Sequence, residues 1–208
     1  MHEPIFTARN EAAKRHMKEG DPVSYRKALD AALLHRAIGL AIESAFRFGQ
    51  DLPVGAVAAN DNWITGRYYS SDGRLSWPPM HAEVMALIDS EYNRFVSIPD
   101  TLVVTLEPCD RCQDSIASTD WCRIKRVGFG ISREEVAERG LVIPHEETIF
   151  ERTARLGYAY EVFKVDDDQL YKAGGLILDF VQRDVTNGSV RVDKEKLNEA
   201  LVEFNVHG

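Results

Sequence analysis

Long apolar runs and a large cysteine set are both missing from this chain of 208 residues. No apolar stretch approaches the roughly 18 residues that cross a bilayer, which argues against a transmembrane protein. Residues 1–5 lack the basic-then-apolar layout of a secretory signal peptide, so export is not expected. Only three cysteines are present, whereas a secreted disulfide framework shows a larger, even set. We therefore expect a cytoplasmic protein with reduced thiols.

A basic balance of charge is also missing, because the formal net charge is −8. Proteins that bind nucleic acid usually present a basic surface, since phosphate contacts dominate their affinity. The acidic total therefore favours a small-molecule substrate over nucleic acid. The contents of 44% hydrophobic and 28% charged residues are ordinary for a globular protein.

Hydrophobic periodicity predicts helices alternating with strands over residues 24–165, which is typical of an α/β layered domain. Residues 1–23 are polar and read as an N-terminal arm, and Ser24 is the expected N-cap of an amphipathic helix that ends near Phe48. The next expected strands cover residues 54–59, 63–69, 101–106, 127–131 and 158–165; the expected helices cover 82–95, a stretch from Asp110 onward, and 145–156. Ser132 and Glu135 fit a capping box. Residues 166–208 read as a helical C-terminal extension, with helices over 168–183 and 193–204 joined by a turn at 186–189.

Two fragments carry the chemistry of the chain, His81-Ala82-Glu83 and Pro108-Cys109-Asp110-Arg111-Cys112. The order H-x-E and then P-C-x-x-C is the pattern of zinc-dependent deaminases. Cys109 and Cys112 lie at the start of an expected helix, where free N–H groups favour the thiolate that a metal needs. His81 precedes its own helix and offers a ring nitrogen beyond the helix tip. These residue types predict a catalytic Zn²⁺ site with ligands His81, Cys109 and Cys112 and a fourth position open to water.

Glu83 completes the predicted site without binding the metal. Zn²⁺ with two thiolates and a neutral imidazole is formally neutral, so it acidifies water less than a three-histidine site does. A nearby carboxylate that takes the proton of the water and passes it to the substrate meets this need. We therefore expect Glu83 to be the catalytic proton shuttle of a hydrolytic deamination that releases ammonia.

Each fragment alone has a simpler interpretation. A lone H-x-E is usually a pair of exposed surface side chains or a helix cap. An isolated C-x-x-C is often a redox-active pair or two of the four ligands of a structural zinc site. Their joint occurrence, in the order helix, strand, helix, favours the deaminase site. Cys122 is not an expected ligand, because a helix would carry it about 15 Å from Cys112; beside Trp121 it reads as a small buried side chain.

At these residues the chain resembles the cytidine deaminase-like superfamily over about residues 24–165. The fragments that carry the resemblance are Pro53-Val54-Gly55-Ala56-Val57, His81-Ala82-Glu83, Thr105-Leu106-Glu107-Pro108-Cys109-Asp110-Arg111-Cys112 and Arg126-Val127-Gly128-Phe129-Gly130. The motif Leu106-Glu107-Pro108-Cys109 is similar to the corresponding motif in the branch that contains tRNA adenosine deaminases and guanine deaminases. The resemblance implies a three-layer α/β/α sandwich around a mixed five-stranded sheet, the ligands and the proton shuttle named above, and a homodimer.

The chain departs from that branch at residues linked to the substrate. The asparagine with which tRNA-acting members contact the nucleoside is missing from residues 67–72, and Asp110 and Arg111 replace small or apolar residues. The candidates for substrate binding are Tyr68, Tyr69, Trp77 and Glu107. The three aromatic rings would stack on a flat heterocycle, or else serve ordinary core or dimer packing. Glu107 would bind an amino group or cap a neighbouring helix, and both alternatives stay open.

Three functions remain at this point. The first is a zinc aminohydrolase acting on a free nucleobase, nucleoside or related aminated heterocycle. The second is a tRNA adenosine-to-inosine deaminase, which would need a basic groove around the pocket. The third is a non-catalytic, zinc-stabilised interaction module, against which the intact Glu83 speaks.

Overall fold

A mixed six-stranded sheet forms the centre of the protein in the computed structural model, which describes residues 3–4, 19–48, 52–70, 81–92, 97–120, 123–141, 147–179, 181–183, 190–193, 195 and 199. The strand order is β1-β3-β2-β4-β5-β6. The strands are β1 (Glu3–Pro4), β2 (Gly55–Asn60), β3 (Trp63–Tyr69), β4 (Thr101–Leu106), β5 (Arg126–Ile131) and β6 (Glu161–Lys164). The helices are α2 (Pro22–Phe48), α3 (Ala82–Tyr92), α4 (Asp110–Ala117), α5 (Arg133–Glu138), α6 (Ile149–Leu156) and α7 (Asp168–Asp179).

The sheet direction changes between β2 and β4. Strand β2 is antiparallel to both β3 and β4, whereas β4, β5 and β6 run parallel to one another. The carboxyl ends of β4 and β5 therefore lie at the same sheet edge. The N–H of Gly55 donates to Oγ1 of Thr105 at 3.1 Å, and Gly55 pairs with Tyr69, so the end of β3 lies at this edge as well.

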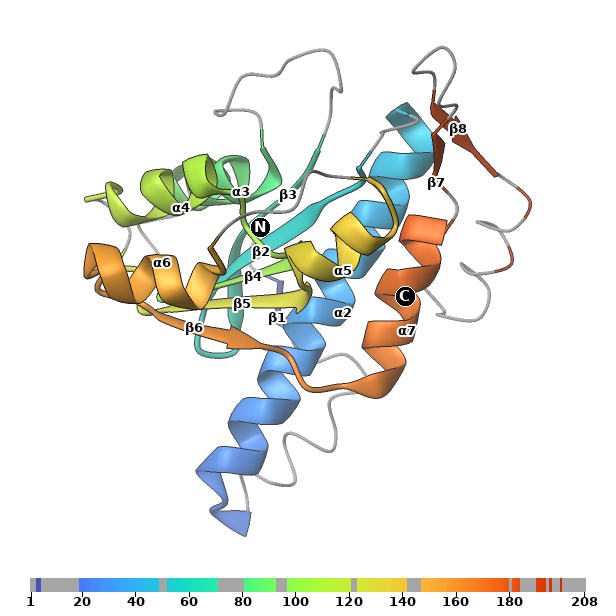
Figure 1. Ribbon diagram of the computed structural model, residues 1–208. Coiled ribbons are helices and arrows are strands. Elements are labelled where there is room, and N and C mark those ends of the chain that lie inside the picture. Colours follow the sequence, from blue (N-terminus) through green and yellow to red (C-terminus); the bar gives the residue numbers. More distant parts are fainter. Residues whose placement is uncertain are drawn as a thin grey trace.

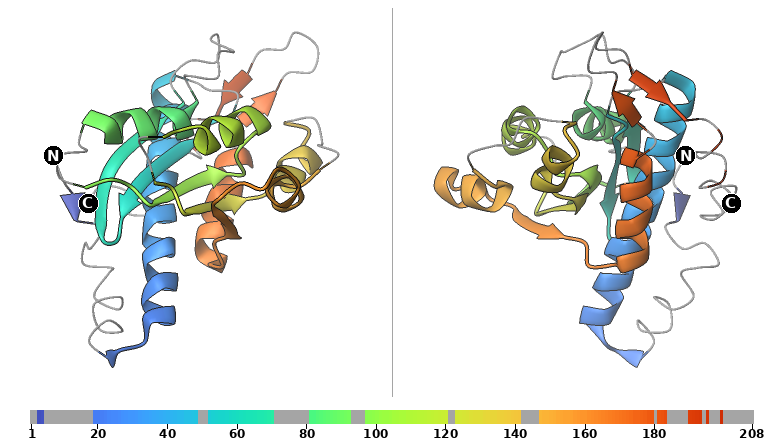
Figure 2. Two further views of the ribbon diagram at one scale, coloured as in Figure 1. Left: turned by 90° about the vertical axis from the view of Figure 1, so that its left-hand side faces the viewer. Right: turned by 45° about the vertical axis from the view of Figure 1, so that its right-hand side comes forward.

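Helices cover both faces of the sheet (Figures 1 and 2). On one face α2 and α7 lie side by side over a core that contains Leu33, Ile38, Val103 and Ile177. On the other face α3 and α4 pack through Ala86, Leu87 and Ile116 onto Leu102 and Val104. Every residue of β4 is buried, as expected for a strand that is covered on both faces. The predicted three-layer α/β/α sandwich with a mixed five-stranded sheet is confirmed, and the two-residue β1 extends its edge.

The first helix starts earlier than predicted. Helix α2 begins at Pro22, and its cap is Asp21 rather than Ser24. The Asp21 carboxylate accepts hydrogen bonds from the N–H groups of Val23 and Ser24 at 3.1 and 3.2 Å. Proline suits the first helical position because its missing N–H would have no helical partner there.

The predicted helix over residues 168–183 is too long. Helix α7 ends at Asp179, and β7 (Val181–Arg183) pairs antiparallel with β8 (Val190–Val192). The β-branched valines in both segments favour extended backbone over a further helical turn. The predicted turn at 186–189 and most of the predicted helix over 193–204 lie outside the described residues. In the part of the chain that the structure describes, no helix is long and apolar enough to cross a membrane.

Candidate active site

The tips of two helices meet where β4 ends, and each tip carries a predicted metal ligand. The carbonyl of His81 accepts the N–H of Met85 at 3.0 Å, and the carbonyl of Cys109 accepts the N–H of Gln113 at 2.9 Å. His81 and Cys109 are therefore the N-cap residues of α3 and α4. An N-cap side chain stands at the end of its helix, and Cys112 on the first turn of α4 completes the group.

The three predicted ligand atoms lie within 4.8 Å of one another. Nδ1 of His81 is 3.1 Å from Sγ of Cys112 and 3.6 Å from Sγ of Cys109. Tetrahedral Zn²⁺ with ordinary bond lengths places a sulfur and a nitrogen ligand about 3.6 Å apart. Among the described residues this is the one group of three or more such side chains close enough to hold a metal ion. The donor set and its spacing fit zinc.

Glu83 lies beside this group, on the first turn of α3, with 5% of its surface exposed. Burial, with the negative charge of Cys109 adding to it, raises the pKa of the Glu83 carboxyl to about 7. A carboxyl group with a pKa near neutrality can both take up and return a proton. The geometry is thus suited to the proton transfer predicted for Glu83.

The pKa values of the two cysteine thiols are shifted in opposite directions. A hydrogen bond from the Cys112 thiol lowers the pKa of Cys109 to about 4, and the same bond raises the pKa of Cys112. A hydrogen bond to Cys109 also raises the pKa of His81, while burial of the ring opposes that rise. Cys109 is therefore held in the thiolate form that a metal cation requires.

Helix α3 is held unusually close to β3 at a glycine. A Cβ atom on Gly66 would lie 2.2 Å from the carbonyl oxygen of Ala86 and 2.5 Å from the nitrogen of Ser90. The Asp89 carboxylate on the same helix accepts the N–H of Arg67 at 2.9 Å. The depth of α3 against the sheet, and with it the position of Glu83, depends on the missing side chain of Gly66.

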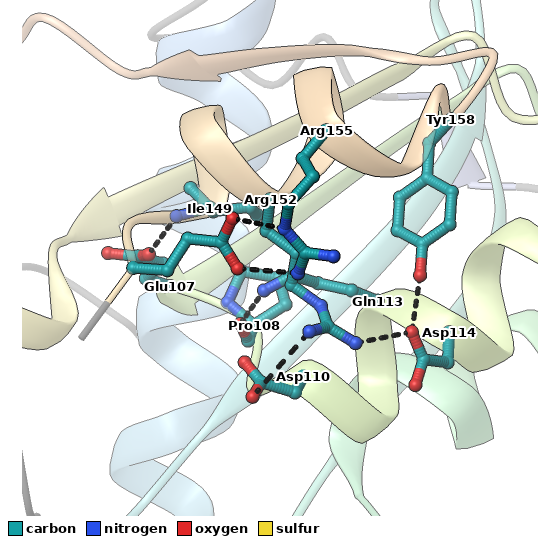
Figure 3. Close-up of polar contacts among 10 residues, drawn as sticks. Glu107, Pro108, Asp110, Gln113, Asp114, Ile149, Arg152, Arg155 and Tyr158 are labelled. Atoms are coloured by element: carbon teal, nitrogen blue, oxygen red, sulfur yellow. Dashed lines mark hydrogen bonds and ion pairs between the residues drawn. The ribbon is translucent and has the colours of Figure 1, made fainter. Parts of the chain in front are cut away.

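The Glu107 carboxylate binds two helix N-termini. Its Oε2 accepts the N–H of Arg133 at 2.8 Å. Its Oε1 accepts the N–H of Ile149 at 2.9 Å, as Figure 3 shows. Of the two alternatives for this residue, the contacts support capping, here of α5 and α6 together. Contact of Glu107 with a substrate stays a prediction.

Gln113 is a residue of the site that the sequence interpretation missed. Its side chain is 2% exposed, and its Nε2 donates to the carbonyl oxygen of Pro108 at 2.9 Å, which fixes the residue before Cys109 (Figure 3). The available signal was its spacing. Gln113 precedes Ile116 by three positions and so occupies the buried side of α4, where a polar residue needs a partner.

The remaining predicted residues fall into two groups. Tyr68 and Tyr69 lie at the same sheet edge as the end of β4, with ring centroids 5.6 Å apart and stacked. Tyr68 also packs against the cluster around Leu87, in agreement with the core-packing alternative. Trp77 and Cys122 lie outside the described residues, so their predictions stay untested.

Comparison with known proteins extends these observations. A protein from Haemophilus influenzae named tRNA-specific adenosine deaminase is 36% identical over 115 residues, which cover 54% of this chain and 64% of the relative. The chain thus spans less than two thirds of the length of this curated relative.

Two solved structures share the fold, each with a TM-score of 0.53. One, from a study of A-to-I editing by tRNA:A34 deaminases, is 21% identical and covers 71% of this chain and 99% of its own. The other, a guanine deaminase from Nitrosomonas europaea, is 16% identical and covers 71% of this chain and 81% of its own.

A family profile that describes the cytidine and deoxycytidylate deaminase zinc-binding region matches residues 28–131, half of the chain. The matched segment contains the three predicted metal ligands and Glu83, and its strands form the centre of the sheet. The chain belongs to the cytidine and deoxycytidylate deaminase zinc-binding family.

Proposed function

We propose that the protein is a zinc-dependent hydrolytic deaminase that acts on a free nucleobase, nucleoside or related aminated heterocycle. The observation that carries the proposal is the buried carboxyl group of Glu83 beside the cluster of His81, Cys109 and Cys112. A structural zinc site has no use for a buried, protonatable carboxyl group next to it, because burying an ionisable group costs stability. An active site uses such a group to move protons.

The reaction replaces the amino group of the substrate by oxygen. Zinc, when bound, supplies the Lewis acidity that makes a water molecule nucleophilic near neutral pH. Glu83 takes one proton from that water and gives it to the ring nitrogen next to the amine-bearing carbon. Glu83 then transfers the second proton to the departing amine, which leaves as ammonia while the carbon–oxygen double bond forms. Each proton taken up is returned, so Glu83 ends the cycle in its starting state.

The charges near the site favour a small substrate. Residues 107–120 and 147–156, which carry α4 and α6, contain six acidic and three basic side chains. Arg152 pairs with Asp114 at 2.8 Å, and Arg155 pairs with Glu147 at 2.7 Å. Binding of a polyanion depends on cations that are available to phosphate groups, and these two are already engaged.

A tRNA adenosine-to-inosine deaminase is the second candidate. The observation in its favour is the 36% identity to a relative named tRNA-specific adenosine deaminase. Salt separates the two candidates, because binding to single-stranded nucleic acid weakens steeply as counterions compete for each phosphate contact. A small uncharged heterocycle would bind almost independently of salt.

Ammonia release from a panel of bases, nucleosides, nucleotides and a tRNA anticodon stem tests the proposal. We expect turnover of at least one free base or nucleoside by the wild type, and turnover about 100- to 10,000-fold slower by Glu83→Ala. Turnover of the tRNA stem alone, with strong salt dependence, would select the second candidate. Full zinc loading without turnover of any member would instead indicate the non-catalytic zinc-stabilised module.

We further propose a cytoplasmic homodimer in which residues 24–165 form the deaminase domain. Phe150 and Leu156 on α6 are 48% and 42% exposed, and such apolar side chains are available for a subunit contact. Light scattering during size-exclusion chromatography should give twice the mass of one chain. We also propose that Tyr68, Tyr69 and Trp77 contact the heterocycle, so that their alanine variants raise KM.

A further inference from the structure

We propose that Glu107 is a positioning residue for the zinc ligands. Its carboxylate holds the turn of Glu107, Pro108 and Cys109 against the N-termini of α5 and α6, and thereby sets the geometry and the retention of the metal. This inference rests on zinc binding at the proposed site and is independent of which substrate is deaminated.

The helices that Glu107 contacts already have caps of their own. Ser132 and Glu135 form a complete capping box at α5, and Thr148 and Glu151 form another at α6. A capping box satisfies the N–H groups of the N-cap and N3 residues, and these boxes are complete without Glu107. The carboxylate of Glu107 therefore does more than begin these helices: it connects both of them to the loop that carries the metal ligand.

The backbone between this carboxylate and the metal ligand is short and constrained. The N–H of Glu107 donates to the carbonyl of Ile131 at 2.8 Å, and the carbonyl of Pro108 accepts from Gln113 at 2.9 Å. Cys109 follows directly. A shift of this turn would change the 3.6 Å separation of Cys109 Sγ and His81 Nδ1. Metal–ligand bonds tolerate deviations of only about 0.2 Å, so a small shift would weaken binding.

Helix α6 is also tied to α4, which carries both cysteines. Arg152 on α6 pairs with Asp114 at 2.8 Å and approaches Asp110 at 3.9 Å, and Tyr158 hydrogen-bonds to Asp114 (Figure 3). One side of α6 thus contacts α4 while its first N–H contacts Glu107. The element that receives the Glu107 carboxylate is itself fixed to the metal-ligand helix.

Three glutamine substitutions separate positioning from helix capping. Glu107→Gln replaces one accepting oxygen by an NH₂ group that cannot accept an N–H. Glu135→Gln and Glu151→Gln weaken the caps of α5 and α6 but leave the metal-ligand turn untouched. Zinc transfer to a chromogenic chelator and the visible absorption spectrum of the Co²⁺-substituted protein are measured for each variant, together with its thermal unfolding.

We expect Glu107→Gln to release zinc about 10- to 100-fold faster than the wild type, because changing a residue that orients a metal ligand typically lowers metal affinity about 10- to 100-fold. The d–d bands of its Co²⁺ form should shift, because they report the geometry of the ligands. Both control variants should keep the wild-type spectrum and release rate even where they lose similar thermal stability. If Glu107→Gln behaves like its controls, the inference is overturned.

A second pair of variants changes the donor instead of the acceptor. Arg133 is the first residue of α5, where proline is tolerated, and Ser132 before it has the extended backbone (φ −73°, ψ 157°) that precedes proline well. Arg133→Pro removes the N–H that Glu107 accepts, whereas Arg133→Ala removes only the side chain. We expect faster zinc release from the proline variant than from the alanine variant, and equal rates would contradict the inference.

The outcomes are separable from those of the proposed function. Both readouts require zinc or cobalt and no substrate, so a wild type that loads metal but releases no ammonia still tests Glu107. If Glu107→Gln does not fold, the Arg133 pair decides. A wild type that binds no zinc at this site would overturn both proposals.

Discussion

Substitution of Gly66 by alanine tests how closely the position of α3 controls the active site. The added methyl group would start 2.2 Å from the carbonyl oxygen of Ala86, against the roughly 3.4 Å that such contacts normally keep. Helix α3 must therefore move away from β3 by about 1 Å, at a cost of about 1–3 kcal/mol of unfolding free energy. Glu83 moves with α3, and a displacement of about 1 Å at a reacting group can reduce the rate about 100-fold.

Urea unfolding and ammonia release measure the two effects, with Gly175→Ala as the matched control. A Cβ on Gly175 would meet its nearest atom, of the Arg139 side chain, at 3.4 Å, an ordinary contact. Because Gly175 lies inside α7, alanine there should stabilise the protein by about 0.5–1 kcal/mol. If Gly66→Ala matched the wild type in both stability and rate, the packing argument for α3 would be wrong.

Four further predictions concern the site and its support. Glu83→Ala should keep one zinc per chain, measured by atomic spectroscopy, and lose about 100- to 10,000-fold in kcat; loss of the metal would contradict its role as a proton shuttle. Cys122→Ser should also keep full zinc stoichiometry, and half-occupancy would argue for a closed, structural site. Asp30→Asn should cost about 3 kcal/mol in urea unfolding, because Asp30 and Arg126 form a largely buried pair with contacts of 2.9 and 2.7 Å; a change below about 1 kcal/mol would refute this. Partial burial opposes the shift, but hydrogen bonds from Lys164 and Ser132 lower the pKa of Glu135 to about 2. The ionised Glu135 carboxylate therefore stabilises the fold above the pKa of about 4.5 that it has in the unfolded chain, and this contribution is lost as the pH falls toward 2. Between about pH 5 and pH 2 the free energy of unfolding, measured with urea, should fall more for the wild type than for Glu135→Gln.

The elements that local sequence determines were predicted well. Strand β4 has the predicted bounds, because its continuous run of β-branched and apolar residues fits only a strand covered on both faces. The capping box of Ser132 and Glu135 is confirmed for the same reason, since both partners lie within one turn. The grouping of His81 with the two cysteines followed from residue types at the ends of two expected helices.

What could not be predicted depends on contacts between distant segments. The two N–H groups that Glu107 accepts lie 26 and 42 residues further along the chain, and no local pattern identifies them. Asp30 and Arg126 are 96 residues apart. The end of α7 was misplaced because periodicity alone does not show where a helix gives way to a hairpin. Such features need the three-dimensional arrangement.

The packing of α7 has a practical consequence for shortened versions of this chain. Leu170, Ala173 and Ile177 share one apolar cluster with Leu33 and Ile38 of α2, so α7 shields a side of α2 that water would otherwise reach. A truncation after Val165 would match the boundary of the sequence resemblance but would expose this apolar side of α2 to solvent. We expect the shortened protein to accumulate in inclusion bodies. Shortened versions of the protein made for expression or fusion should therefore include the chain at least through Asp179.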